Sequence, residues 1–525
     1  MIRFCRGLPT LAVLPFACGL SLADDKPVLP AVSPASSEPQ KSEPQKSTDQ
    51  KTNTTKNPIQ DAPKLPLQTP AQVRFGSPKN PVVGEVVDID LTKPLSLKRA
   101  VRIGLQRQNS IAISRTQVDS ANARLIQSQS AYLPRVTPSF SFNTNLQPGG
   151  IVFVNGQAFR GSATSQILSN GINASLTIYD MGLREASVGA ARRNTFASEF
   201  GLGDQRQGVI LTVTSSYYSL ARSKELVRVQ EENVRRAETN LAVITEQVKV
   251  GSAAKSDTLQ AQSDLANARV SLLSAQSDYD VAQASLKNAM GIVVDTPVNL
   301  TDDTVALPEP TADPLKTEDY MKIAYDNRLD LKQQVERIYA QGYSVRQAII
   351  NNGLTLNATI NQGYALDPNS GQTRTFLVSA SYPLFDGGSS RAAVRDNKAL
   401  LEQQRRTLDQ LQQSIRLNVE QSLRVREVAR QRVQAAKIAV EAGQLNYQAA
   451  LERQRNGLIN ILDVLNAQVQ LVTAQVSLVQ ATYDFYISDA QLVRFVGVND
   501  PEYTPRVPGY VKPVQPGITP APSGK

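Results

Sequence analysis

The chain contains no histidine and no tryptophan, and its only cysteines are Cys5 and Cys18. The lack of histidine excludes most acid–base, nucleophilic-triad and zinc chemistry. The lack of cysteine after Cys18 excludes disulfides and thiolate sites from the rest of the chain. A GxxxxGK[ST] phosphate-binding loop is also missing. We therefore expect neither an enzyme nor a site for a cofactor or a metal.

The N-terminus has the pattern of an export signal. Arg3 and Arg6 precede a short apolar stretch, and small residues end it at Ala23. We expect residues 1–23 to be a signal peptide, with a lipid anchor on Cys18 as the alternative. Cleavage would remove 2 of the 56 basic residues and leave 54 against 47 acidic ones. This mild excess, without a basic cluster among aromatic residues, gives no support for nucleic-acid binding.

Composition divides the rest of the chain into five segments. Residues 24–94 are rich in Pro, Ser, Lys and Gln and predict a disordered linker, because they carry too little apolar area to offset ordering entropy. A Pro-rich tail ends the chain at 498–525. The two halves at 95–290 and 318–497 repeat each other, and residues 291–317 form the connector between them.

The duplication is visible in three pairs of residues at an offset of 206 positions: Gly251 with Gly457, Asp257 with Asp463, and Asp180 with Asp386. Each half predicts a helix, a strand, a loop, a strand, a long helix, a tight turn and a helix.

The predicted strands alternate between apolar and neutral polar residues, as in a half-buried sheet. They cover Val136–Asn145, Asn173–Tyr179, Leu354–Asn361 and Thr375–Tyr382. Their length fits strands that cross a bilayer, since such strands need about 9–11 residues, and a small soluble sandwich is the alternative. We expect surface loops at 144–170 and 363–374.

The predicted helices are long. Residues 183–249 form a proline-free stretch of 67 residues, enough for about 100 Å of helix. Apolar residues spaced alternately by three and four follow in 261–289 and 462–493, which predicts left-handed coiled coils. The glycines at 201, 203 and 208 predict a local bend. Four strands cannot close a barrel, so the sheet must take strands from further copies of the chain.

Three motifs carry a family resemblance. "YPLFDGG" at 382–388, "ARLIQSQSAYLPRV" at 123–136, and the two helix-to-helix turns with the pattern G…D…A…L are similar to those of the TolC-type outer-membrane efflux proteins. The resemblance spans about Leu95 to Gly497. It implies a mainly α fold with a membrane β-barrel: a homotrimer whose 12-stranded barrel, four strands per protomer, continues as a long antiparallel α-helical coiled-coil barrel.

The resemblance also implies a function. The chain would be the outer-membrane exit duct of a tripartite efflux or type I secretion system in a Gram-negative bacterium, with most of its mass in the periplasm. Its partners would be two further copies, a periplasmic adaptor protein, an inner-membrane transporter of RND or ABC type, and outer-membrane lipid. The alternative is a structural coiled-coil protein of the cell envelope without transport activity.

The resemblance assigns roles to two groups of residues. The periplasmic gate and adaptor-docking tip comprises Gly251, Asp257, Gly457, Asp463 and Asn466. Asp463 occupies the position of an acidic ring in the family, whereas Asn466 replaces the next acidic position and Ile459 replaces a gate arginine. Helix capping is the alternative role for both aspartates.

The second group forms the turns between barrel and tunnel: Asp180, Gly182, Pro383, Asp386, Gly387 and Gly388. Glycine suits these turns because it tolerates backbone angles and close contacts that other residues do not. We further expect aromatic belts at the membrane interfaces, with the candidates Phe140, Phe142, Tyr179, Tyr364, Phe376, Tyr382 and Phe385.

Overall fold

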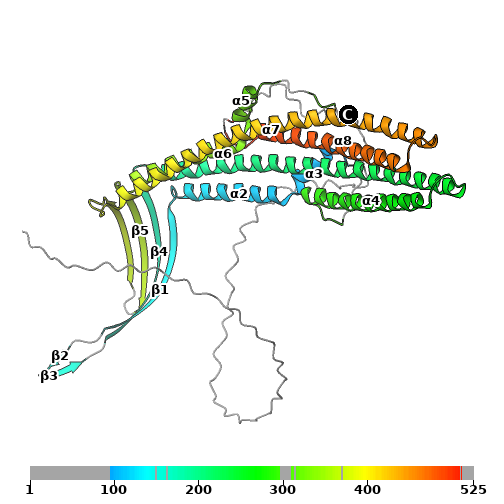
Figure 1. Ribbon diagram of the computed structural model, residues 1–525. Coiled ribbons are helices and arrows are strands. Elements are labelled where there is room, and N and C mark those ends of the chain that lie inside the picture. The colour runs from blue at the N-terminus through cyan, green and yellow to red at the C-terminus, as the bar shows by residue number, and fades with distance from the viewer. Residues whose placement is uncertain are drawn as a thin grey trace, which may run out of the picture. The chain divides into compact units, whose positions relative to one another are not determined.

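The computed structural model describes residues 95–147, 151–160, 163–295, 309–311, 315–367, 371–508 and 510 (Figure 1). The expected signal peptide, the N-terminal linker and most of the connector lie outside these residues, as does the tail after Tyr510. The chain divides into two units, 1–78 and 79–525, and every described residue belongs to the second.

The order of the helices and of the main-sheet strands is the same in both halves, as the duplication predicts. The first half contains α1 (Leu97–Arg107), α2 (Asn109–Ser130), β1 (Arg135–Gln147), β2 (Ile151–Val154), β3 (Gln157–Arg160), β4 (Ala163–Tyr179), α3 (Leu183–Lys249) and α4 (Lys255–Ala289). The second half contains α5 (Thr317–Asn327), α6 (Leu329–Ile350), β5 (Thr355–Asp367), β6 (Gly371–Ser381), α7 (Ser389–Arg455) and α8 (Ile461–Val496). The small hairpin β2–β3 has no counterpart among the described residues of the second half.

The main sheet is antiparallel, with the strand order β1-β4-β5-β6 (Figure 1). Its strands are longer than the sequence predicts. The two expected surface loops, 144–170 and 363–374, are largely strand, because β1 and β4 continue in register to the pair Gln147 and Ala163, and β5 and β6 to the pair Ala365 and Gly371. The alternation of apolar and polar residues ends earlier than the strands do, because Ser, Asn and Gly occupy the distal strand positions.

The register gives the sheet one apolar and one neutral polar face. Opposite residues share a face, so Leu176 and Ala358 lie with the pair Ile360 and Phe376 on the apolar side. The exposed side chains of this face include Val136, Phe140, Phe142, Ile172, Ile360, Phe376 and Val378. Hydrogen bonds between side chains link neighbouring strands on the other face.

These polar contacts run across three strands. The hydroxyls of Ser141 and Ser169 lie 2.8 Å apart, and the Thr177 hydroxyl donates to Asn357 Oδ1 at 2.9 Å. The Asn173 side chain also donates to that of Asn361. Serine, threonine and asparagine thus form neutral hydrogen bonds with one another along this face, while the apolar face has no covering layer in the described part of the chain.

Two helical hairpins form the body next to the sheet. The helix α3 packs on α4, α7 packs on α8, and α3 also contacts α8, while α6 lies between α3 and α7 (Figure 1). Both α3 and α7 contain 67 residues, and α3 has the bounds that the sequence predicts. Among the described helices, none combines the length and apolar character needed to cross a membrane.

The predicted apolar stripe of α4 is confirmed, whereas that of α8 is confirmed only in part, since Leu465 and Tyr486 are buried as predicted. The α4 stripe is buried at Ala261, Leu265, Ala268, Leu286 and Ala289. In α8, by contrast, Leu462 and Val469 of the predicted stripe are exposed, while their neighbours Ile461 and Gln468 are buried. Because α8 carries apolar residues on more than one side, spacing alone cannot tell which side faces the chain's own core.

The glycines of α3 serve close packing. An added Cβ on Gly201 would lie 2.5 Å from Nε2 of Gln333 in α6, and one on Gly203 would clash with Leu329 and Tyr503. Gly208 differs, because an added Cβ would meet no described atom within 4 Å. Gly201 and Gly203 therefore let α6 and the segment after α8 approach α3.

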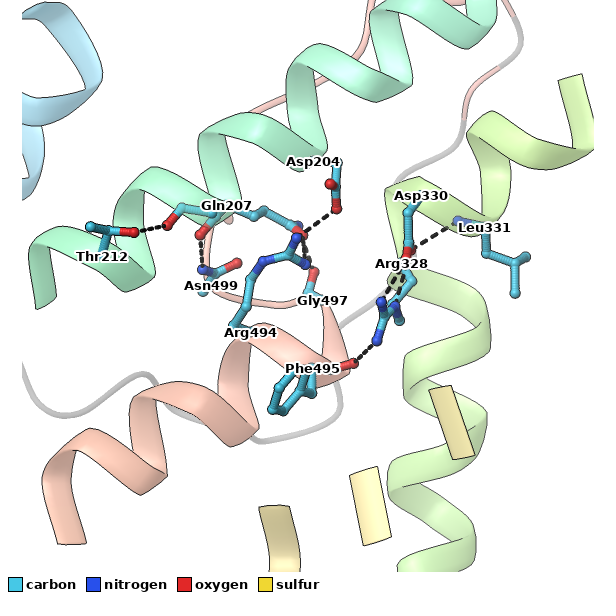
Figure 2. A network of polar contacts seen from close by, with 11 residues as sticks. Asp204, Gln207, Thr212, Arg328, Asp330, Leu331, Arg494, Phe495, Gly497 and Asn499 are labelled. Carbon is cyan, nitrogen blue, oxygen red and sulfur yellow. Dashed lines mark hydrogen bonds and ion pairs between the residues drawn. The ribbon is translucent and has the colours of Figure 1, made fainter. Parts of the chain in front are cut away.

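A buried polar network joins the two repeats where α8 ends (Figure 2). The Arg494 guanidinium donates to Asp204 Oδ1 at 2.7 Å and to Gln207 Oε1 at 3.2 Å. Gln207, itself buried, donates through Nε2 to the Gly497 carbonyl at 2.9 Å. The end of α8 is therefore fixed to α3 by hydrogen bonds between buried polar groups.

The same end of α8 is also fixed to α6. Arg328, which precedes α6, donates to the Phe495 carbonyl at 3.3 Å and pairs with Asp330 at 2.6 Å (Figure 2). Burial opposes ionisation of Asp330, but the hydrogen bonds from Arg328 outweigh it and lower the pKa of this carboxyl. The segment after α8 continues along α3, where the Tyr503 hydroxyl donates to the Glu199 carbonyl at 3.0 Å.

Candidate functional sites at the strand-to-helix turns and the hairpin tips

The two strand-to-helix turns have the same construction. The Asp180 carboxylate accepts the backbone N–H groups of Gly182 at 3.2 Å and Arg184 at 2.9 Å. At the equivalent place in the second repeat, Asp386 accepts those of Gly388 at 2.9 Å and Ser390 at 2.7 Å. Each aspartate therefore satisfies N–H groups that have no partner within the helix and places a negative charge at the helix N-terminus.

The residues after each aspartate adopt left-handed backbone angles. Gly387 and Gly388 have φ of 66° and 89°, and Met181 and Gly182 have φ of 55° and 89°. Glycine therefore suits these positions because of the left-handed backbone conformation that the turn requires. The expected close contacts are not found at Gly387 and Gly388, since an added Cβ on either would meet nothing within 4 Å in the described part of the chain.

The side-chain partners of the two aspartates differ. Arg184 pairs with Asp180 at 2.8 Å and donates to the Thr177 carbonyl at 2.7 Å, with its guanidinium over the Tyr132 ring. Burial opposes ionisation of Asp180, but the hydrogen bonds from Arg184 outweigh it and lower the pKa. Arg184 thus joins the end of β4 to the residues that precede β1.

Asp386 has neutral partners instead. It accepts hydrogen bonds from the Ser390 hydroxyl and, at 2.6 Å, from Asn352 Nδ2. The hydrogen bonds from Ser390 and Gly388 hold the pKa of this carboxyl well below its usual range. Asn352 precedes β5, so this turn is joined to the start of β5 much as the first is joined to the start of β1.

Pro383 lies in the exposed link between β6 and the second turn, beside Leu384 and Phe385, which are 91% and 89% exposed. The predicted belt residues are all exposed in the described chain: Phe140, Phe142, Tyr179, Tyr364, Phe376, Tyr382 and Phe385. Their role in a membrane interface stays a prediction.

The tips of the two hairpins are also built alike. Gly251 and Gly457 follow α3 and α7 with φ of 78° and 72°. The N–H groups of Ser252 and Leu458, one residue later, return to the carbonyls of Gln247 at 2.8 Å and Arg453 at 2.9 Å. This is the Schellman termination, which requires a left-handed residue and favours glycine. The offset of 206 in the sequence therefore reflects one turn geometry used twice.

The two tip aspartates differ in their contacts. Asp257 accepts the N–H of Ala254 at 3.4 Å and the Ser256 hydroxyl at 3.2 Å, so it caps α4. Asp463 is exposed, and its carboxylate has no hydrogen bond or ion pair within the described residues. Asn466 is exposed one turn further along α8, while Ile459 is partly buried against the core at the tip. The structure therefore gives Asp257 a capping role and leaves Asp463 accessible.

Sequence reasoning missed three residues of these sites: Arg184, Asn352 and Met181. Arg184 lies four positions after Asp180, a spacing that brings helical side chains together and could have indicated the pair. Asn352 and Met181 contact residues that are distant in sequence. No local sequence pattern indicates such contacts. Within the described ranges, no group of three or more acidic or sulfur ligands could hold a metal ion.

Comparison with known proteins identifies the family. The model of the outer membrane efflux protein family matches residues 101–292 and 321–498. The outer membrane efflux protein BepC of Brucella suis is 25% identical over 389 residues, 73% of this chain and 81% of that protein.

Solved structures agree in fold. CusC superposes with a TM-score of 0.67 at 18% identity, covering 76% of this chain and 92% of that one. The outer membrane channel CmeC of Campylobacter jejuni superposes with a TM-score of 0.65 at 18% identity, covering 77% and 86%. The chain therefore belongs to the outer membrane efflux protein family, which is a family of outer-membrane channels and not of enzymes.

Proposed function

We propose that three copies of this chain form a passive exit duct across the outer membrane and periplasm. The main support is the sheet. It has one exposed apolar face, one neutral polar face, and no strand beyond β1 or β6 in the described chain. Unpaired strand edges cannot be left exposed in lipid, so the sheet needs further copies to close into a barrel. The apolar face would then contact lipid and the polar face would line the pore.

The helices support the same assembly. Apolar side chains without a covering layer in the described chain follow α4 and α7, at Leu259, Val270, Leu273, Val281, Leu417, Val425, Ile438 and Leu445. Such a surface on a helical hairpin needs an apolar neighbour. Adjacent copies would supply it and extend the wall of the duct away from the membrane.

The hairpin tips would then form the periplasmic end, with the gate and the docking surface for an adaptor protein. Three copies of Asp463 would bring exposed carboxylates together around the symmetry axis. With no phosphate-binding loop in the sequence, the energy for export would come from an inner-membrane transporter. The substrate would be selected there as well. A structural envelope protein without a pore is the competing function.

The proposal is tested by purification from outer membranes, followed by mass determination in detergent and recording in planar bilayers. A trimer that conducts ions in discrete steps supports the duct. A monomer, or a trimer without conductance under any applied voltage, supports the structural alternative. Crosslinking from a photoreactive residue at Leu458, which is 73% exposed at the tip, would capture the adaptor. The same residue placed at Arg424, whose side chain is 78% exposed on the shaft of α7, is the matched control.

A further inference from the structure

A cavity of about 210 Å³ lies between α3 and the α7–α8 hairpin, close to the Gly457 tip. Its lining comes from α3, the last turns of α7 and the first turn of α8, and includes Arg235, Arg236, Asn240, Tyr447, Gln454 and Arg455. One water needs only about 10–15 Å³ of such volume, so the cavity has room for a larger polar guest.

The charged part of this lining is entirely cationic. It contains three arginines and no carboxylate. Two of the arginines lie at the exposed rim: Arg235 pairs with Glu232, and Arg455 pairs with Glu452 at 2.8 Å. Their side chains are 64% and 67% exposed. Exposed ion pairs of this kind contribute little energy, so both guanidinium groups can turn toward a stronger anionic partner.

Arg236 is the inner cation. Its Nη2 donates to Gln475 Oε1 at 3.2 Å, while its Nε is buried and has no hydrogen-bond partner in the described part of the chain. No carboxylate forms an ion pair with it among the described residues. A buried guanidinium donor without an acceptor is costly, and a guanidinium keeps its charge in proteins.

Neutral groups complete the lining. Tyr447 is buried, and burial raises the pKa of its hydroxyl, which therefore stays protonated and able to donate. Gln454 donates to Gln247 at 3.1 Å and closes the side toward the tip. Asp264 of α4 interacts electrostatically with Tyr447 but does not line the cavity. The lining thus offers side-chain donors from α3 and α7 and only positive charge.

We propose that this cavity binds a small oxyanion of the sulfate, phosphate or carboxylate class. Arg236 would donate to one oxygen from the part of its guanidinium that lines the cavity, and the rim guanidinium groups of Arg235 and Arg455 would reach the others. Planar guanidinium groups suit oxyanions because two N–H groups can engage one anion. The occupied site would link α3 to the last turn of α7, and so would couple anion binding to the position of the α7–α8 tip.

The test is calorimetric titration of sulfate into the purified full-length protein, with chloride adjusted to keep ionic strength constant. We expect saturable binding that weakens roughly tenfold or more in Arg236→Gln, since a charge-assisted hydrogen bond is lost. Arg228→Gln is the matched control: Arg228 lies on the same helix, is 68% exposed and is not part of the lining. This variant should bind as the wild type does.

A second measurement separates the anion site from a water-filled void. Selenate, which has the shape of sulfate, should give an anomalous peak beside Arg236 in crystals of the wild type and none in Arg236→Gln. Circular dichroism of the variant should show unchanged helix content. No saturable binding to the wild type, equal binding by Arg236→Gln, or water alone beside Arg236 would overturn the proposal. None of these readouts depends on transport, so they leave the proposed duct function to its own test.

Discussion

The Met181 sulfur accepts a hydrogen bond from the backbone N–H of Leu354 at 3.2 Å. This contact joins the strand-to-helix turn of the first repeat to the helix-to-strand turn of the second. Met181 has φ of 55° at the position where the second repeat has Gly387 with φ of 66°. A left-handed angle costs a residue with a side chain about 1–2 kcal/mol. Packing of the thioether on Gly353 and Leu354 offsets this strain.

Substitution of Met181 should separate strain from packing. Met181→Ala keeps the strained angle and loses the contact, whereas Met181→Gly loses both. We therefore expect the glycine variant to be more stable than the alanine variant by about 1 kcal/mol. The midpoint of thermal unfolding, followed by circular dichroism, measures the difference. An alanine variant at least as stable as the glycine variant would contradict this account.

Gly387→Ala is the control for this comparison. An added Cβ there meets no described atom within 4 Å, so its cost of about 1 kcal/mol should come from backbone strain alone.

The glycines of α3 allow a second comparison. Gly208→Ala should stabilise the protein by up to about 1 kcal/mol, because alanine favours a helix and the site is open. Gly203→Ala gains the same propensity but clashes with Leu329 and Tyr503, so we expect net destabilisation. Urea unfolding of the two variants in parallel provides the measurement. Equal effects would show that the tail and α6 do not pack on α3 as described.

The exposed Asp463 leads to a prediction about the conductance of the duct. It is exposed and without a partner in the described chain, whereas Asp257 caps α4. Asp463→Asn should therefore alter the closed-state conductance of the duct and its block by multivalent cations, with little effect on stability. Asp257→Ala should lower stability by about 0.5–2 kcal/mol, as expected for a lost cap. Bilayer recordings and thermal unfolding of both variants distinguish the roles. A stability loss in Asp463→Asn without a change in conductance would contradict the gate assignment.

Buried tyrosines predict the response to alkaline pH. Burial, and then the charge of Asp489, raise the pKa of Tyr218 from 10.0 to about 12; burial and then Glu225 do the same for Tyr483. The folded state therefore favours the neutral hydroxyl. Its contribution to stability is complete below pH 10 and is lost as the pH rises toward 12. For Tyr218 the loss is up to about 3 kcal/mol.

Unfolding midpoints at a series of pH values, with tyrosinate absorbance, measure this loss. Tyr218→Phe should flatten the decline between pH 10 and 12, because phenylalanine cannot ionise. A decline as steep as in the wild type would show that other groups control it.

Local rules account for much of the architecture. The bounds of α3 follow from a proline-free stretch that Gly182 and Gly251 enclose, and both glycines have the left-handed angles that end or begin a helix. The alternation in β4 and β5 predicts which residues share a face. These features depend on neighbours in sequence, so the sequence suffices to place them.

Other features depend on contacts distant along the chain. The buried side of α8 differs from the prediction at Leu462 and Val469, which are exposed. Ile461 and Leu462 are both apolar, and only the packing against α3 and α7 selects between them. Equivalent positions in the repeats also diverge: Asp257 caps a helix while Asp463 does not. A shared motif therefore predicts a shared backbone conformation, whereas the role of each side chain depends on the residues around it.

The open edges of the sheet constrain how the protein reaches its membrane. β1 and β6 end the strand order, and each leaves a row of backbone groups unpaired within the described chain. Hydrocarbon would not hydrate those groups, so a lone chain would be poorly soluble in lipid despite its apolar face. In the proposed barrel shared between copies, insertion and assembly would therefore be a single event, and a newly exported chain would have to stay in water, with its edges shielded, until further copies join it.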